Sequence, residues 1–388
     1  MTWLEDVRRE IGILNKKIYL NNASSGPIPK PVYNRVCMVM EESYSEGEPW
    51  DEFLDTIPRF REIFSRFIGA SRDEVAYIPG VTYGLETLIS SIDLDRDSNI
   101  VISELNFPTT IVMAHSMARR GVVKEVRMVR DRGGYTDINE YERVIDDKTS
   151  LVIVDYVPWL TGYLEDLRYI SSLAHDHGAY IVSDMFHAIG VIPVDVKELG
   201  VDAAVTGSYK WLMSLHGVGA LYVNKDVMDE LMPKYMGWLA IEDSVWDRRE
   251  RGEDEFRRPF NLINFNYSRR ASRFELGTPP IVPLIAFYES LKFLEEFKAP
   301  ERFYTHTYKL VNRLMDGLMD MGYEILTSRE RHASIVSFRH DDPHTLAADL
   351  YEEGVEVSAR PGLIRVSPHF YNTMDDIEAF LELLGKKD

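Results

Sequence analysis

One segment of the chain joins a short apolar strand to a lysine, and it reads Val201-Asp202-Ala203-Ala204-Val205-Thr206-Gly207-Ser208-Tyr209-Lys210. Trp211-Leu212-Met213 follows directly, so Lys210 lies in apolar surroundings. Burying an ammonium group there is costly unless its pKa falls or an anion pairs with it. A lysine kept neutral in this way is the kind that forms Schiff bases. On spacing alone, a lysine that reaches solvent or forms a salt bridge is an equal alternative.

A carboxylate ends the preceding predicted strand, Tyr180-Ile181-Val182-Ser183-Asp184, about one strand–helix unit before Lys210. Both side chains would then project from the carboxyl ends of neighbouring parallel strands, where open α/β sheets bind ligands. A buried carboxylate there needs a cationic partner, and a protonated ring nitrogen would serve. The alternative is that Asp184 caps a helix or forms a structural ion pair.

The rest of the chain has the pattern of an α/β protein, in which β-branched apolar segments alternate with segments of helical period. Strands are predicted at 74–78, 99–103, 151–156, 180–184 and 203–207. Residues 19–223 are therefore predicted to form one doubly wound domain. A long helix is predicted from Pro283, followed by a smaller α+β domain with strands at 323–326, 333–338, 355–358 and 363–366. The charged segment 243–273 is predicted to be a solvated loop or a segment that crosses to a partner subunit.

The turn Gly80-Val81-Thr82-Tyr83-Gly84 follows a strand and opens a helix. Backbone N–H groups and the helix dipole at such a place suit a phosphate, and Thr82 adds a hydroxyl. Thr82 as a simple N-cap is the alternative. The turn has neither the lysine of a nucleotide-binding phosphate loop nor the glycine spacing of a dinucleotide site, which disfavours a nicotinamide-dependent oxidoreductase.

Three further side chains are candidate site residues, and each also has an ordinary structural interpretation, which for Phe107 alone is the favoured one. Phe107 follows the strand at 99–103 and could stack on a flat cofactor, or be a core residue. His187 comes shortly after Asp184 and could bond to that carboxylate or to a cofactor, or be a satisfied core histidine. Arg365 alternates with apolar neighbours, so its fork could bind a substrate carboxylate, or face solvent.

Composition excludes several classes of protein. Lys plus Arg number 44 and Asp plus Glu number 63, giving a formal net charge of −19. This balance argues against binding to nucleic acid or to anionic membrane. The single cysteine, Cys37, excludes an internal disulfide, a cysteine-rich zinc site and an iron–sulfur cluster, and no metal site is predicted. No apolar run is long enough to span a membrane, so a cytoplasmic location is expected.

The motifs taken together resemble the fold-type I pyridoxal-5′-phosphate (PLP) enzymes, in the aminotransferase class V branch and its kynureninase and isopenicillin N epimerase-like subgroup. Tyr209 stands where most of this branch has histidine before the lysine, a variant that resembles the kynureninases. The other motifs that carry the resemblance are 19–27 (YLNNASSGP), 106–109 (NFPT), 184–188 (DMFHA), 237–238 (GW), 274–280 (FELGTPP) and 364–372 (IRVSPHFYN).

This resemblance implies a three-layer PLP-transferase fold, with a mostly parallel sheet in a large domain (16–270) and a small α+β domain (1–15 plus 280–388). It implies PLP as cofactor, bound by Lys210 as a Schiff base, with Asp184 on the ring nitrogen and Arg365 on the carboxylate of an amino-acid substrate. The other cofactor residues that it implies are Val81, Thr82, Phe107, His187, Tyr209, Trp238 and Thr278. Thr278 would come from the second subunit of a homodimer.

The resemblance leaves the reaction at the substrate α-carbon open. A class V aminotransferase is expected, with a kynureninase-like C–C hydrolase or an amino-acid epimerase as alternatives. A non-catalytic scaffold of the same fold is the alternative from another class. A cysteine desulfurase is not expected, because the stretch 329–337, where that reaction's cysteine would lie, has none, and Cys37 is near the other end of the chain.

Overall fold

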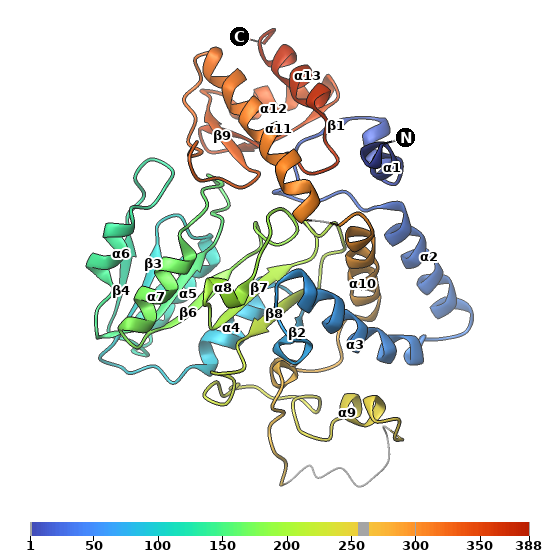
Figure 1. The fold of residues 1–388 in the computed structure, drawn as a ribbon, viewed down its shortest axis with the longest axis vertical. Helices are drawn as coiled ribbons and strands as arrows, with labels where there is room; N and C mark the ends of the chain where they lie inside the picture. The colour runs from blue at the N-terminus through green and yellow to red at the C-terminus, as the bar shows by residue number, and fades with distance from the viewer. Residues whose placement is uncertain (1, 255–263, 299, 388) are drawn as a thin grey trace.

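The computed structural model describes residues 2–254, 264–298 and 300–387 (Figure 1). Its centre is a seven-stranded sheet in the order β2-β8-β7-β6-β5-β3-β4. The strands are β2 (Val75–Ile78), β3 (Asn99–Ser103), β4 (Glu125–Val129), β5 (Thr149–Asp155), β6 (Tyr180–Asp184), β7 (Ala203–Gly207) and β8 (Gly219–Val223). Only β8 runs antiparallel to its neighbours in this sheet. The predicted α/β fold with a mostly parallel sheet is confirmed.

Helices cover both faces of this sheet, which gives three layers (Figure 1). The helices of this part of the chain are α2 (Lys30–Ser45), α3 (Trp50–Phe67), α4 (Val81–Ser91), α5 (Pro108–Arg119), α6 (Ile138–Val144), α7 (Leu167–Asp176), α8 (Val196–Leu199), α9 (Val245–Glu250) and α10 (Ile281–Glu296). Successive residues of a strand point to opposite faces. In β5, Val152 and Val154 accordingly join one apolar cluster, while Leu151 and Ile153 join the other.

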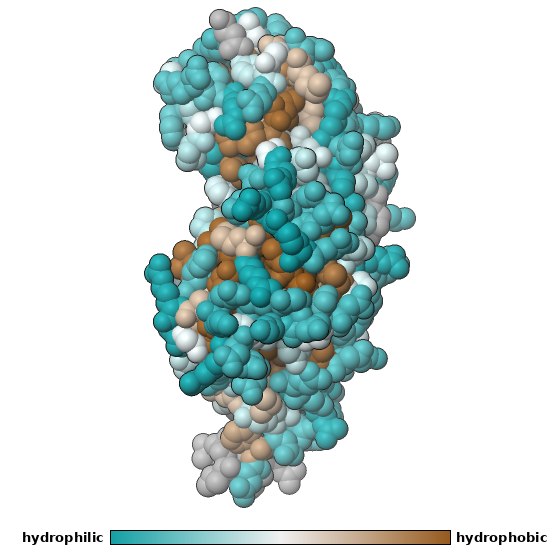
Figure 2. Space-filling model, turned by 90° about the vertical axis from the view of Figure 1, so that its left-hand side faces the viewer, coloured by the Kyte–Doolittle hydropathy of each residue, from teal (hydrophilic) through white to brown (hydrophobic). Residues whose placement is uncertain are grey.

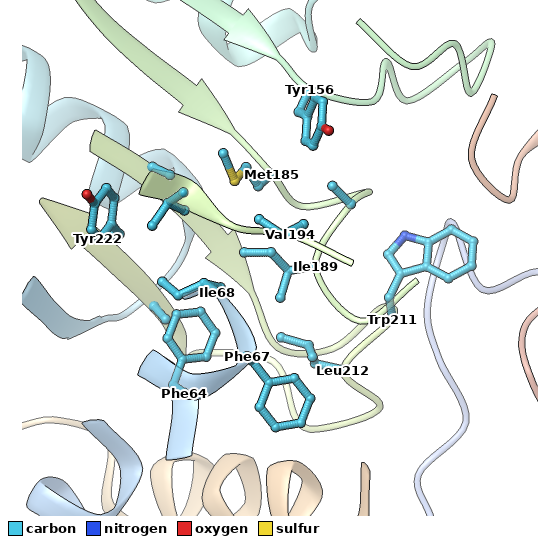
Figure 3. Packing of buried hydrophobic residues seen from close by; sticks show 14 of the residues in the cluster. Phe64, Phe67, Ile68, Tyr156, Met185, Ile189, Val194, Trp211, Leu212 and Tyr222 are labelled. Atoms are coloured by element: carbon cyan, nitrogen blue, oxygen red, sulfur yellow. The ribbon is translucent and has the colours of Figure 1, made fainter. Parts of the chain in front are cut away.

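The larger of these two clusters fixes the loop that carries Lys210 (Figure 3). Trp211 and Leu212 are almost completely buried in it, together with Phe64, Ile68 and Met185. Fully burying side chains of this size contributes roughly 1.5–3 kcal/mol each. The residues after Lys210 therefore pack in the same core as residues of α3 and of the segment after β6.

The C-terminal part is built on the three-stranded sheet β11-β12-β9, with β9 (Val336–Arg339), β11 (Ser358–Arg360) and β12 (Leu363–Val366). Its helices are α11 (Glu301–Asp320), α12 (Pro343–Glu352) and α13 (Met374–Leu384). The segment 323–326 forms no strand but a single bridge between Ile325 and Phe338.

The N-terminal segment lies beside the C-terminal part of the chain in the upper part of Figure 1. Strand β1 (Ile18–Tyr19) pairs in parallel with β10 (Val355–Glu356), and Arg8 in α1 (Trp3–Arg9) forms an ion pair with Asp376 in α13. This pairing brings the residues after β1, including Ser24, against β11 and β12.

The face in Figure 2 is mostly hydrophilic, with apolar patches in its upper part and at its centre. Within the described ranges, no helix combines the length and the apolar character that a membrane crossing requires.

Candidate active site

A cavity of about 230 Å³ lies at the carboxyl ends of the parallel strands. Its wall contains Lys210, which follows β7, Asp184, which ends β6, and Asp155, which ends β5. The other predicted residues in the wall are Val81, Thr82, Phe107, His187 and Tyr209. Seven side chains singled out from separate parts of the sequence thus meet in one place, together with Asp155.

The amine of Lys210 contacts His187, and His187 is in turn hydrogen-bonded to Trp211. Its Nζ lies 3.0 Å from Nε2 of His187, and Trp211 Nε1–H donates to Nδ1 of the same ring at 3.1 Å. A neutral imidazole has one N–H, and because Nδ1 accepts, that proton belongs on Nε2. The Nε2–H group then donates to the lone pair of Lys210 Nζ, which requires an uncharged amine.

The electrostatic surroundings agree with this neutral amine. Burial and the positive charges of Arg365 and Arg360 together lower the pKa of Lys210 to about 7, against the opposing effect of Asp184 and Asp155. Burial holds the pKa of His187 well below its usual value. The result is a nucleophilic amine at neutral pH.

The Asp184 carboxylate can accept more hydrogen bonds than the protein donates to it. Oδ1 accepts a hydrogen bond from the Phe186 backbone N–H at 2.8 Å, and burial raises the pKa of Asp184 to about 6. A cation placed beside it, such as a protonated ring nitrogen, would offset the cost of burying this charge.

Asp155 is a residue that sequence reasoning missed. It lies opposite Asp184 in the pairing of β5 with β6. Its Oδ1 accepts from Asn106 Nδ2 and its Oδ2 from the Phe107 backbone N–H, both at 2.6 Å. Burial and the neighbouring Asp184 raise the pKa of Asp155. The carboxylate fixes the turn that carries Phe107 at the cavity.

The N-terminus of α4 supplies N–H groups to another wall of the cavity. Helix α4 starts at Val81 after Gly80, and no side chain caps it. A Cβ on Gly84 would lie 2.5 Å from Ile78 and 2.9 Å from Val205, so only glycine lets α4 pack this close to the sheet. The free N–H groups of the first turn, with the Thr82 hydroxyl, form a site suited to a phosphate.

Three predicted residues lie outside the cavity wall. Trp238 and Thr278 are exposed, and Thr278 lines a neighbouring pocket with Tyr77 and Pro279. Arg365 is 1% exposed, and its Nη1 donates to the Trp159 carbonyl. In one chain, therefore, Trp238 and Thr278 do not join Lys210.

The chain matches a known family over most of its length. The model described as aminotransferase class-V covers residues 18–380. The chain belongs to the aminotransferase class-V family. The resemblance drawn from the motifs is thereby confirmed, and PLP is the cofactor of this family. Among the described residues, no cluster of three or more metal-ligating side chains is present.

Class-V relatives similar to this chain carry different activity names. The uncharacterized aminotransferase YcbU of Bacillus subtilis is 26% identical over 386 residues, covering 99% of this chain and 98% of that protein. A probable cysteine desulfurase of Methanothermobacter thermautotrophicus is 26% identical, covering 98% of this chain and 97% of that protein. Kynureninase 2 of Neurospora crassa is 28% identical, covering 95% of this chain and 85% of that protein.

A solved structure shares the fold. A cysteine desulfurase from Thermococcus onnurineus superposes with a TM-score of 0.85 at 24% identity, covering 100% of this chain and 98% of that one. The expectation that excluded cysteine desulfurases is wrong, because relatives and structural neighbours carry that name. The stretch 329–337 contains no cysteine, but this does not exclude the chain from that group of relatives.

The residues of the cavity fit the cofactor of the family. Lys210 offers an uncharged amine, Asp184 a carboxylate with an unfilled oxygen, and the start of α4 uncapped N–H groups. PLP carries an aldehyde, a basic ring nitrogen and a phosphate, one group for each of these partners.

Proposed function

We propose that this protein is a PLP-dependent enzyme that acts at the α-carbon of an amino acid and transfers its amino group. The observation that carries the proposal is the contact between Lys210 Nζ and His187 Nε2, which requires a neutral amine in the cavity beside Asp184. PLP, when bound, withdraws electrons from the α-carbon of the substrate and weakens the bonds there.

The residues of this chain have distinct tasks in the proposal. Lys210 would hold the aldehyde carbon of PLP, and Asp184 would keep the ring nitrogen protonated. Val81, Thr82 and Tyr209 would bind the phosphate, and Phe107 would stack on the ring. Once released by the substrate, the amine of Lys210 would take the proton from Cα, as a base with a pKa near neutrality does best.

The substrate carboxylate is assigned to Arg365 in this proposal. The guanidinium is buried, has an unpartnered Nε, and makes no ion pair within the described residues. A planar carboxylate is the anion that an arginine fork binds best.

We also propose a homodimer, in which the second subunit supplies Trp238 and Thr278. Both side chains are exposed in the single chain and lie away from Lys210. Thr278 lines a pocket that shares Pro79 and Tyr83 with the wall of the cavity, so a neighbouring subunit could complete the site from this side.

Cleavage of a C–S bond is a second candidate, favoured by the relatives named as probable cysteine desulfurases. It begins with removal of the same α-proton by Lys210. The two reactions then differ in whether the amino group or the sulfur leaves the substrate carbon skeleton.

The products distinguish these reactions. The PLP-loaded protein would be incubated with single amino acids, including cysteine, without a second substrate. Amino transfer predicts one equivalent of 2-oxo acid per site and conversion of PLP to its amine form. Release of sulfide or persulfide with alanine or pyruvate would instead assign C–S cleavage. No product from any amino acid would contradict both candidates.

A further inference from the structure

Two arginines of the C-terminal sheet donate to one serine hydroxyl. In the antiparallel pair of β11 with β12, Ser358 lies opposite Arg365 and Arg360 lies opposite Leu363. Alternation along each strand therefore places Arg360 and Arg365 on the same face. Arg365 Nη2 and Arg360 Nη2 both donate to Ser24 Oγ, at 2.8 and 3.1 Å.

The neutral oxygen of Ser24 is a poor partner for two cations. It lies 3.3 Å from the Ser358 hydroxyl as well, which fills its hydrogen-bonding capacity. The remaining partners of the two guanidinium groups are the carbonyls of Trp159 and Ala359. In the described part of the chain, no carboxylate pairs with either arginine. Two neighbouring cations of this kind favour the binding of anions.

The positive charges of Arg360 and Arg365 lie close enough to Lys210 to affect its pKa. Arg360 lies 6.0 Å from the centre of the Trp159 ring, and that ring packs edge-on against Phe107 at 5.7 Å. Phe107 and Lys210 line the cavity together. The positive charges of Arg360 and Arg365 also lower the pKa of both Lys210 and His187.

We propose that Arg360 forms a second anion-binding subsite, so that the substrate is an amino acid with an acidic side chain. The inference rests on the proposed function, in which Arg365 binds the α-carboxylate. That carboxylate neutralises one guanidinium and leaves the other without a counter-charge. A second acidic group on the same substrate would supply it, and the planar fork of Arg360 suits a side-chain carboxylate.

Unreactive acids of equal length test this subsite directly. Dissociation constants of succinate and butyrate, and of glutarate and valerate, would be measured by calorimetry on the PLP-loaded protein. We expect the diacid to bind roughly 10- to 100-fold more tightly than the monoacid of the same length. In Arg360→Gln this ratio should fall to about one, with the monoacid affected little.

Two further variants make the test specific. Arg365→Gln should weaken both monoacid and diacid. Arg339→Gln, on the adjacent strand β9 and paired with Glu324, should leave the diacid preference unchanged. Equal binding of monoacids and diacids to the wild-type protein would overturn the proposal. Equal weakening of both acids by Arg360→Gln would also overturn it, because the two arginines would then share a single carboxylate.

The same samples separate this inference from the proposed function. If amino acids lose their α-proton on the enzyme but acidic ones have no advantage, only the second subsite is wrong. If diacids are preferred but no amino acid loses its α-proton, the subsite stands as an anion site and the proposed function is wrong.

Discussion

The Nζ of Lys210 lies 3.0 Å from Nε2 of His187, whose other nitrogen accepts a hydrogen bond from Trp211. The imidazole can satisfy both contacts only if its proton is on Nε2 and the lysine is uncharged. The buried core holds Trp211 in place, and Trp211 fixes the tautomer of His187. The core therefore influences the protonation state of Lys210 through His187.

The pH dependence of cofactor attachment should reveal this neutral lysine. The amine reacts when deprotonated, so the rate of PLP incorporation should rise through pH 7 and level off above about pH 8, whereas an ordinary lysine continues to gain reactivity beyond pH 10. Stopped-flow absorbance on the apo-protein measures this rate. A rate still rising at pH 10 would show that the amine is charged at neutral pH.

Arg360 contributes to this low pKa, so its removal should shift the same profile. Arg360→Gln takes away a positive charge that disfavours the protonated amine, and the midpoint should move to higher pH. Arg339→Gln is the matched control, because Arg339 is exposed and its charge is paired with Glu324. Equal midpoints in all three proteins would contradict the coupling between Arg360 and Lys210.

Asp184→Asn should separate cofactor binding from catalysis. The amide has the shape of the carboxylate but no charge to stabilise a protonated ring nitrogen. We expect PLP to remain bound while α-proton exchange slows by about 100-fold or more. Asp147→Asn, at a side chain that is 94% exposed, serves as control. An exchange rate in Asp184→Asn within a few-fold of wild type would argue against this role for the charge.

Asp155 should be coupled energetically to Asn106. Removing the carboxylate in Asp155→Ala leaves the Phe107 N–H without its partner and should lower the free energy of unfolding by about 1–3 kcal/mol. Asn106→Ala and the double variant complete a cycle, with an expected coupling of about 0.5–3 kcal/mol. Denaturant titration of the four proteins measures it. Strict additivity would mean that the hydrogen bond contributes nothing.

Gly26 is a position at which a single methyl group should disturb the Lys210 loop. Its N–H donates to the Tyr209 carbonyl, and a Cβ there would lie 2.0 Å from the Lys210 carbonyl oxygen. Gly26→Ala should lower the free energy of unfolding by about 1–3 kcal/mol and weaken PLP binding. Gly12→Ala, where a Cβ meets nothing within 4 Å, should change neither. Similar effects in the two variants would refute the close contact.

The positions of Lys210 and Asp184 could be predicted from the sequence, because they depend on the local pattern of buried strands. Lys210 and Asp184 follow apolar runs that are buried on both sides, and parallel strands bring their carboxyl ends to one edge. Strand β4 was not predicted, because it is an edge strand with Glu125 exposed and lacks a continuous apolar run. Its position at the sheet edge explains this pattern.

Contacts between distant segments could not be predicted in the same way. Ser24 and Arg360 are separated by 336 positions and meet because β1 pairs with β10. Asp155 ends a strand as Asp184 does, which is a signal that could have been used, but its partners Asn106 and Phe107 belong to another loop. The domain boundaries, the homodimer and the cytoplasmic location remain predictions.

Exchange of the substrate α-proton tests the central claim most directly. The PLP-loaded protein would be incubated in deuterated water with a panel of amino acids, acidic ones included, and deuterium at Cα followed by NMR. We predict exchange in the wild-type protein and in Lys292→Ala, a variant of an exposed lysine paired with Glu289, and none in Lys210→Ala. Exchange that persists in Lys210→Ala, or is absent from the wild-type protein with every amino acid, would contradict the account.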